Sequence, residues 1–230
     1  MNVHCRNIHF QYPGTDRLLF ENLNVDFSQP GLHALFGPSG AGKSSLAKMI
    51  IGRMRPDSGE IRIDSAGSPL YAHNLERLPG WSSIGRHLEL VTPAKHLEQK
   101  KELVGAFGLA ALLGRRFDEL SLGQQNRVNL VRYLIQEVDI LLMDETLSNV
   151  DEKMRCRILT TIKEMFPMRL FVYISHNVVE VSTYCQEIWV LRGPQKHPQA
   201  IMVNGQDQRN GGYSDHPALQ RTMLEVMNAA

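Results

Sequence analysis

The stretch GPSGAGKS, residues 37–44, constrains the fold of this chain more than any other feature of its sequence. It fits the pattern GxxxxGK[ST], in which backbone N–H groups surround phosphate oxygens and glycines let the chain approach them closely. An apolar run over residues 33–36 precedes the loop, and residues 43–51 follow it with apolar side chains at helical spacing. The sequence therefore predicts a strand, a glycine loop and a helix in the order that phosphate binding requires.

The loop predicts a nucleotide site. Lys43 should reach the β and γ phosphates, and Ser44 should ligate Mg²⁺. A plain strand-to-helix turn, the alternative interpretation, would need neither side chain. The residues expected to bind the nucleotide here are Gly37, Pro38, Ser39, Gly40, Ala41, Gly42, Lys43, Ser44 and Ser45.

Composition narrows the possible partners. With 230 residues and 43% hydrophobic content, the chain can bury the core of one large domain. Its 25 Lys and Arg residues nearly balance 24 Asp and Glu residues, so no basic excess favours nucleic acid as a partner. Cys5, Cys156 and Cys185 are widely spaced and form no metal or disulfide pattern, which favours buried thiols in a reducing cytosol. No signal peptide or membrane span is expected, so any role at a membrane should depend on a partner.

Hydrophobic periodicity predicts an α/β fold with a parallel core sheet and an antiparallel β part at the N-terminus. The expected elements are antiparallel strands within 2–36, a strand over 60–64, buried strands over 140–143, 170–174 and 188–191, and helices over 43–51, 94–113, 124–136 and 217–227. Residues 65–95 and 193–212 are expected to be irregular because they are rich in proline, glycine and polar residues.

Two acids end the apolar run ILLMDE, residues 140–145. At the carboxyl edge of the sheet beside the glycine loop, Asp144 could hold Mg²⁺ through water and Glu145 could orient the attacking water. An apolar run meeting a solvated turn would look the same in isolation. The preceding phosphate loop favours the functional interpretation.

Two further stretches are ambiguous by themselves. ELSLGQQNR places Ser121 and Gly123 just before a predicted helix, where they could present donors to an anion, or where Ser121 could simply cap the helix. YISH ends another apolar run with His176, an imidazole that could sense a γ-phosphate. Their weight comes from the order of the motifs along the chain.

GPSGAGKS, LSLGQ, ILLMDE, SNVD and His176 follow one another as in ATP-binding cassette (ABC) ATPases, which the chain closely resembles. The resemblance implies that Tyr12 stacks on adenine, although Tyr12 could also be a packed strand aromatic. It implies that Ser121, Gly123 and Gln124 contact ATP held by a second copy. It also implies that Asp151 closes the loop after Glu145 and that His176 is a switch histidine. The cofactors implied are ATP and Mg²⁺.

The resemblance also implies a single ABC ATPase domain over 1–230. Its expected parts are a β-rich and phosphate-loop part (1–80), a shortened helical subdomain (81–134), the rest of the core (135–195) and a C-terminal tail (196–230). Such a chain would be a cytoplasmic ATPase held on the inner face of the cell membrane by a permease. It would pair with a second cassette, most simply its own copy, and would serve a solute-binding protein indirectly.

The short single chain resembles importer subunits, and the LLMDE block and C-terminal tail resemble the nitrate, sulfonate and taurine group. An exporter ATPase and a degenerate cassette that binds ATP in a structural or regulatory role are the alternatives. The degenerate interpretation rests on departures from the family pattern. Leu122 stands where the family has glycine, Thr146 replaces a proline, and no glutamine lies between Gln29 and Gln99.

In this family a glutamine in that interval touches Mg²⁺ and couples the cassette to the membrane partner. Counting without gaps places it near Ser83 in this chain. Ser82, Ser83, His87 and Glu89 are the candidates to replace it.

Overall fold

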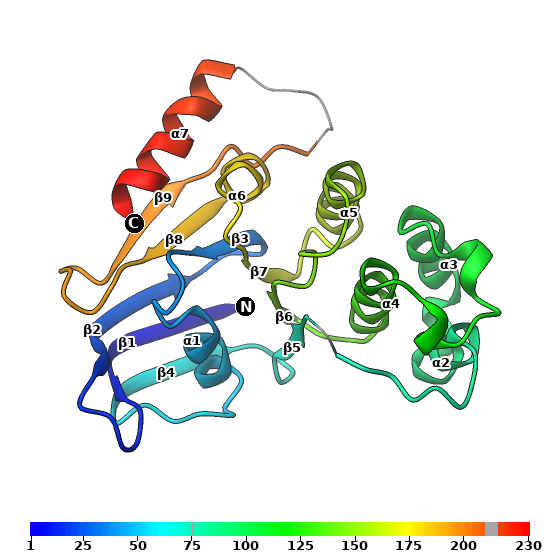
Figure 1. The fold of residues 1–230 in the computed structure, drawn as a ribbon, viewed down its shortest axis with the longest axis horizontal. Coiled ribbons are helices and arrows are strands. Elements are labelled where there is room, and N and C mark those ends of the chain that lie inside the picture. Colours follow the sequence, from blue (N-terminus) through cyan, green and yellow to red (C-terminus); the bar gives the residue numbers. More distant parts are fainter. Residues whose placement is uncertain (75, 210–215) are drawn as a thin grey trace.

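The chain builds two sheets, and the computed structural model describes residues 1–74, 76–209 and 216–230 (Figure 1). The first sheet is antiparallel, with β1 (Asn2–Gln11) between β2 (Leu18–Phe27) and β4 (Ser58–Asp64). Alternating apolar residues of β1 and β2 face inward, as expected for a sheet with one solvated face. This sheet confirms the antiparallel strands predicted from the N-terminal residues.

The second sheet has six strands in the order β5 (Leu70–His73), β6 (Ile140–Asp144), β7 (Leu170–Ile174), β3 (Gly31–Phe36), β8 (Glu187–Leu191) and β9 (Ala200–Asn204). All neighbours are parallel except β8 and β9, which are antiparallel. Every residue of β6 and β7 is buried, which explains why their sequences are unbroken apolar runs. The carboxyl ends of β3, β6 and β7 meet at one edge, where the predicted site residues follow them.

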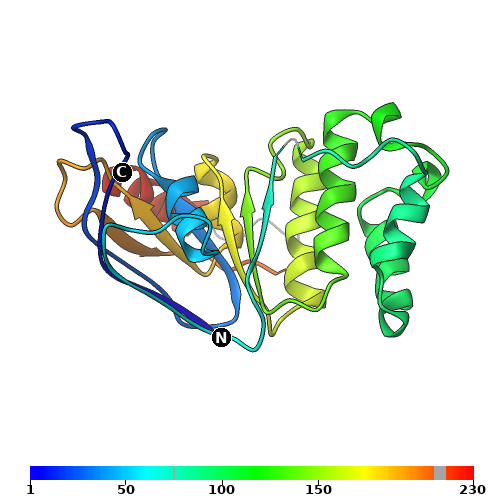
Figure 2. The ribbon, with the colours of Figure 1, turned by 90° about the horizontal axis from the view of Figure 1, so that it is seen from below.

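The helices lie around the two sheets, and those between β5 and β6 form a separate group. Helix α1 (Lys43–Ile50) packs into the core shared with the first sheet, and α6 (Val178–Tyr184) and α7 (His216–Ala229) pack against each other near β8 and β9. Helix α5 (Glu152–Met165) follows β6. The separate group, α2 (Ile84–Val91), α3 (Leu97–Ala106) and α4 (Leu122–Leu134), lies on the side away from the three-stranded sheet and α7 (Figures 1 and 2).

The predicted secondary structure of three segments is wrong. Residues 65–95, expected to be irregular, contain β5 and α2, because Pro69, Pro79 and Pro93 flank these elements rather than interrupt them. The helix expected over 94–113 is broken into α3 and short 3₁₀ turns at 94–96 and 110–112, and Gly108 reverses the chain at φ 64°. The loop expected over 193–212 contains β9, and its residues 210–212 lie outside the described part of the chain.

None of the helices in the described residues combines the length and apolar character needed to cross a membrane. The C-terminal helix predicted over 217–227 is present as α7.

Candidate functional site

The glycine loop joins β3 to α1 and keeps its backbone open toward solvent. Gly37 has φ 145°, and a Cβ there would lie 2.3 Å from the Leu191 carbonyl oxygen. Gly42 has φ 95°, and a Cβ there would lie 2.5 Å from the ring of Phe20. Both positions therefore require glycine. No side chain caps α1 and no acid lies in its first turn, so its N-terminal N–H groups and dipole are available to an anion.

Lys43 folds back over this loop. Its ammonium group donates to the carbonyl oxygens of Gly37 at 2.8 Å and Pro38 at 2.9 Å. Burial lowers the pKa of Lys43, and the nearby carboxylates of Glu145 and Asp144 oppose that shift. The Lys43 ammonium group therefore lies beside the loop and is hydrogen-bonded only to neutral carbonyl oxygens there. A phosphate could take the place of these carbonyls as its partner.

Asp144 ends β6 and is almost buried, with 8% of its surface exposed. Tyr71, on the neighbouring strand β5, donates its hydroxyl to Asp144 at 2.5 Å and also hydrogen-bonds Ser44. Burial, followed by the bond to Asp144, raises the pKa of Tyr71 well above its usual value, so the tyrosine stays protonated. A carboxylate and a hydroxyl next to a phosphate loop suit Mg²⁺, which prefers one or two protein oxygens with phosphate and water as further ligands. Ser44 and Asp144 fit that requirement.

Glu145 occupies a strained position directly after β6. Its φ is 51°, in the left-handed region that non-glycine residues rarely adopt, and its N–H donates to the Ile174 carbonyl at 3.0 Å. One Glu145 carboxylate oxygen lies 3.5 Å from Nδ1 of His176, which follows β7. Both side chains are exposed, so the neighbouring strands β6 and β7 present an acid and an imidazole together at the sheet edge.

These residues border one cavity of about 540 Å³. It is lined by Tyr12, Leu19, Ser39, Gly40, Gly42, Lys43, Ser44, Ser45, Asp144, Glu145 and His176. The hydroxyl of Tyr12 lies 2.6 Å from Ser45 Oγ, and its ring packs edge-to-face on Phe10 with centroids 5.0 Å apart. The cavity therefore combines phosphate-binding backbone, a buried acid, an exposed acid and an aromatic wall in one chain.

The ELSLGQQNR segment lies elsewhere. Ser121 Oγ accepts from the Gln124 N–H at 3.4 Å, and Gln124 Oε1 accepts from the Ser121 N–H at 3.0 Å. This reciprocal capping box starts α4 and confirms the interpretation of Ser121 as a helix cap. Ser121, Gly123 and Gln124 are not among the described residues that line the cavity. Asp151 likewise caps a helix, since it accepts from the Met154 N–H at 3.0 Å at the start of α5.

The candidates for the missing glutamine have other roles. Ser83 caps α2 by accepting from the Arg86 N–H at 3.3 Å. The buried ring of His87 hydrogen-bonds the Pro79 carbonyl at 2.8 Å. Ser82, Ser83, His87 and Glu89 are absent from the described lining of the cavity. Ser83 and His87 thus have local structural roles, and the placement of the glutamine function near Ser83 stays a prediction.

Asn74 is the amide that sequence reasoning missed. It directly follows β5, and its N–H donates to the Asp144 carbonyl at 3.1 Å. Its side chain donates to Ser148 Oγ at 2.9 Å and accepts from Asn126 of α4 at 2.9 Å. Asn74 was not predicted because counting without gaps pointed to the region of Ser83, and residues 65–95 were expected to be irregular. The signal was the short apolar run LYAH that ends at this amide.

A glycine loop between a parallel strand and a helix, with acids at the end of a neighbouring strand, defines a P-loop nucleotide-binding protein. Residues 20–148 match the family model described as ABC transporter. The chain belongs to this family, as the order of motifs predicts.

Similar proteins agree with that assignment. A xylose/arabinose import ATP-binding protein of Haloferax volcanii is 32% identical over 76% of this chain and 51% of its own length. An uncharacterized ABC transporter ATP-binding protein of Haemophilus influenzae is 31% identical over 91% of this chain and 92% of its own length. The chain thus spans about half the length of the first relative and nearly all of the second.

The fold has solved counterparts. A bacterial Atm1-family ABC exporter with ATP bound superposes with a TM-score of 0.79 at 22% identity, covering 99% of this chain and 41% of the exporter chain. This likeness establishes the ABC ATPase fold.

Proposed function

We propose that the chain is the ATP-hydrolysing subunit of an ABC transporter. One observation carries the proposal: Lys43, Asp144, Glu145 and His176 border the same cavity at the edge of the parallel sheet. They come from three separate segments of the sequence, which supports their proposed roles as a cation for phosphate (Lys43), a metal ligand (Asp144) and a base (Glu145) beside a histidine. A cassette that only bound nucleotide would not need an exposed acid held in a strained conformation beside a histidine.

ATP binding should use the loop and Lys43 together. The glycine-loop N–H groups and the α1 N-terminus would bind phosphate oxygens, and the Lys43 ammonium would exchange its Gly37 and Pro38 carbonyl partners for the β and γ phosphates. Ser44 and Asp144 would hold Mg²⁺, which when bound neutralises the phosphate charge that develops during transfer. Tyr71 keeps the Asp144 carboxylate oriented through its hydroxyl.

Hydrolysis needs a positioned water. Glu145 is the candidate to accept a hydrogen bond from that water and orient it toward the γ phosphate. His176, 3.5 Å from Glu145, would contact the same region from β7. Ser121, Gly123 and Gln124 would complete the site from a second copy, because within one chain they lie outside the cavity lining. Asp151, at the start of α5, would lie at the contact between the two copies.

The proposed partners are an integral membrane permease, which would hold this chain at the inner face of the cell membrane, and a solute-binding protein acting through that permease. Import of a small solute is favoured over export because a 32% identical relative is named for xylose/arabinose import. That name lends no support to the nitrate, sulfonate and taurine group. We propose Asn74 in the position of the missing glutamine. It directly follows β5, its main-chain N–H donates to the Asp144 carbonyl, and its side-chain amide contacts Ser148 and Asn126 of α4.

The test is phosphate release from Mg-ATP by the purified chain, alone and with its permease. Glu145→Gln should retain ATP binding and lower kcat by about 10² or more, because an amide cannot accept the water proton. Lys43→Ala should weaken ATP binding by removing charge from the phosphates. Lys48→Ala, an exposed position on the same helix, is the matched control and should match the wild type. Hydrolysis by Glu145→Gln at the wild-type rate would remove Glu145 from the catalytic role, and a wild-type chain without activity would favour the degenerate cassette.

A further inference from the structure

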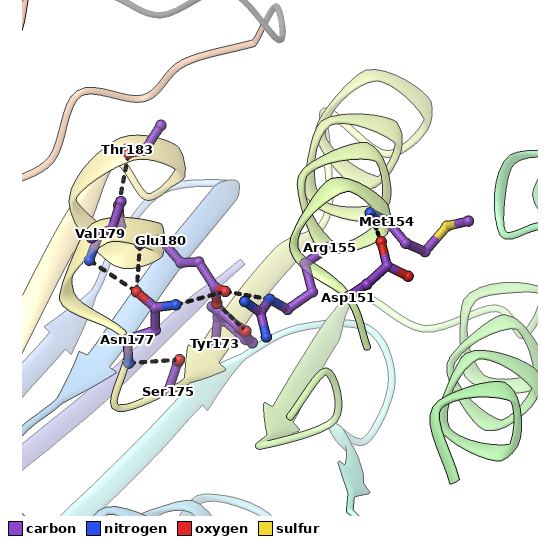
Figure 3. Close-up of polar contacts among 9 residues, drawn as sticks. All are labelled: Asp151, Met154, Arg155, Tyr173, Ser175, Asn177, Val179, Glu180 and Thr183. Atoms are coloured by element: carbon purple, nitrogen blue, oxygen red, sulfur yellow. Dashed lines mark hydrogen bonds and ion pairs between the residues drawn. The ribbon is translucent and has the colours of Figure 1, made fainter. Parts of the chain in front are cut away.

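A buried carboxylate outside the cavity joins three elements that carry or flank site residues. Glu180, in the first turn of α6, accepts the Tyr173 hydroxyl at 2.9 Å and the Asn177 amide at 2.9 Å, and its carboxylate lies 2.5 Å from Nε of Arg155 (Figure 3). These partners come from β7, from the residue before α6, and from α5. Glu180 is only 6% exposed, so its charge is compensated almost entirely by these neighbours.

The network fixes the residues on both sides of His176. Asn177 caps α6, because its Oδ1 accepts from the N–H groups of Val179 at 3.1 Å and Glu180 at 3.2 Å. The Asn177 N–H donates to Ser175 Oγ at 3.1 Å. The chain therefore has little freedom immediately before and after His176, although the His176 side chain itself is 73% exposed.

The same network holds the start of α5. Arg155 lies one turn after the cap residue Asp151, and its guanidinium crosses from α5 to Glu180 (Figure 3). A small cavity of about 60 Å³ separates this ion pair from the catalytic edge. Its lining includes Arg155 and Glu180 as well as Glu145 and His176. The ion pair thus lines the same small cavity as the pair proposed to act on the γ phosphate.

We infer that Arg155 and Glu180 are positioning residues that lock His176 to the α5 segment beginning at Asp151, so that both move as one unit. The inference rests on the proposed ATPase function. In the assembled site, Asp151 would meet a second copy while His176 meets the γ phosphate. The Arg155 to Glu180 ion pair would therefore make the placement of His176 beside Glu145 depend on how the second copy seats against α5.

Glu180→Gln tests the lock with an isosteric change. The glutamine can still accept from Asn177, but it removes the charge that draws the Arg155 guanidinium across from α5. We expect kcat for Mg-ATP hydrolysis to fall about tenfold while KM stays within about twofold, because a small displacement of an oriented group affects the chemical step more than binding. Unchanged kcat in a folded Glu180→Gln protein would overturn the inference.

Epistasis with His176 separates positioning from general destabilisation. If Glu180 acts through His176, adding Glu180→Gln to His176→Ala should cause no further loss of kcat. If the two losses multiply, Glu180 acts independently of His176 and the inference is wrong. Hydrolysis by the wild-type chain must be seen in the same assay. Its absence would instead count against the proposed function.

Two further variants guard against a trivial folding effect. Tyr173→Phe removes one hydrogen bond to Glu180 and keeps the ring, so it should give a smaller loss of kcat in the same direction, and an unchanged kcat there would contradict the inference if Glu180→Gln does not fold. Asp207→Asn is the matched control. It weakens the 2.8 Å ion pair to the buried Lys163 on the same helix α5, away from His176. It should lower thermal stability without changing kcat, and an equal fall in kcat would mean that any weakening of α5 has the same consequence.

Discussion

Two helices of this chain begin in ways suited to an anion, and they differ in what occupies their first turn. Helix α1 starts after Gly42 with no side-chain cap, inside a cavity that also holds Lys43 and Asp144. Helix α4 starts at Ser121 with a complete capping box, and Ser121 is exposed. The N-terminal N–H groups of α1 are therefore available to a ligand, whereas in α4 the Ser121 side chain already accepts from one of these N–H groups.

The difference supports the proposal that the α1 end and the α4 end serve ATP sites in different copies. The α1 end has the cation and acids that a nucleotide requires, so it can hold ATP within one chain. The α4 end has no charged partner in its first turn and can be satisfied in isolation by Ser121 and Gln124. Gly123 adds a steric condition, because a Cβ there would lie 2.2 Å from the Asn149 carbonyl oxygen. The α4 end is therefore suited to complete a site whose phosphates another copy already holds.

Ser121→Arg tests this division most severely. The long cationic side chain would occupy the space between two copies, so we expect ATP binding to persist and hydrolysis to be lost nearly completely. Hydrolysis by Lys43→Ala should also be lost, for the separate reason that its own loop no longer holds the phosphates. Mixing the two variants in equal amounts should restore about a quarter of wild-type hydrolysis, since half of the dimers would be mixed and each would keep one intact site.

Phosphate release from the mixture measures this effect, with each variant alone as the reference. No recovery on mixing would mean that the chain does not pair with itself, and a second, different cassette would then be required. Full activity of Ser121→Arg alone would remove α4 from the site altogether.

The same two regions differ in how much of the site could be predicted from the sequence. The cavity side was predictable because its residues follow fully buried parallel strands, whose unbroken apolar runs mark the points where Asp144 and His176 emerge. Lys43 and Ser44 were predictable because the glycine pattern tolerates few alternatives. Tyr71 was missed, because a hydroxyl aimed at Asp144 leaves no mark in a four-residue edge strand.

The α4 side was less predictable for a different reason. A helix cap and a phosphate contact both need a hydroxyl group just before a helix. The local sequence around Ser121 therefore cannot distinguish these two roles. The placement of Asn74 depends on the pairing of β5 with β6, a contact between residues 70–73 and 141–144 that no local pattern reports. Long-range pairing, rather than local propensity, therefore decided the placement of Asn74.

Asn74 offers a test of intermediate size, because it connects the two regions. Its main-chain N–H bonds the Asp144 carbonyl, and its side-chain amide donates to Ser148 and accepts from Asn126 of α4. We expect Asn74→Ala to lower kcat about tenfold by loosening α4 from the metal-binding edge. Asn74→Asp can still accept from Asn126 but cannot donate to Ser148. Its kcat should therefore lie between those of Asn74→Ala and the wild type. The measurement is Mg-ATP turnover with the permease present.

Ser83→Gln is the companion variant. Because Ser83 caps α2 and lies outside the described lining of the cavity, a glutamine there should bring no gain in turnover and should cost some helix stability. A rise in permease-stimulated turnover in Ser83→Gln would return the glutamine function to Ser83 and would remove Asn74 from that role.

Among the residues that line the cavity, Tyr12 should give the smallest effect, because it acts only at the open wall. Tyr12 is 41% exposed, and its hydroxyl is hydrogen-bonded to Ser45. Stacking of a base on an aromatic side chain contributes about 1–3 kcal/mol, and the exposure of Tyr12 places it at the low end. Tyr12→Ala should therefore raise KM for ATP about fivefold and leave kcat unchanged.

Two comparisons show which part of Tyr12 matters. Tyr12→Phe keeps the ring and removes only the bond to Ser45, so it should behave like the wild type if stacking is the role. GTP should show the same fivefold change in Tyr12→Ala, because every base presents a π face. If Tyr12→Phe loses as much as Tyr12→Ala, the hydroxyl that holds Ser45 beside the phosphate loop is the contributing group. Tyr12 would then belong with Lys43 and Ser44 on the phosphate side of the cavity rather than on the base side.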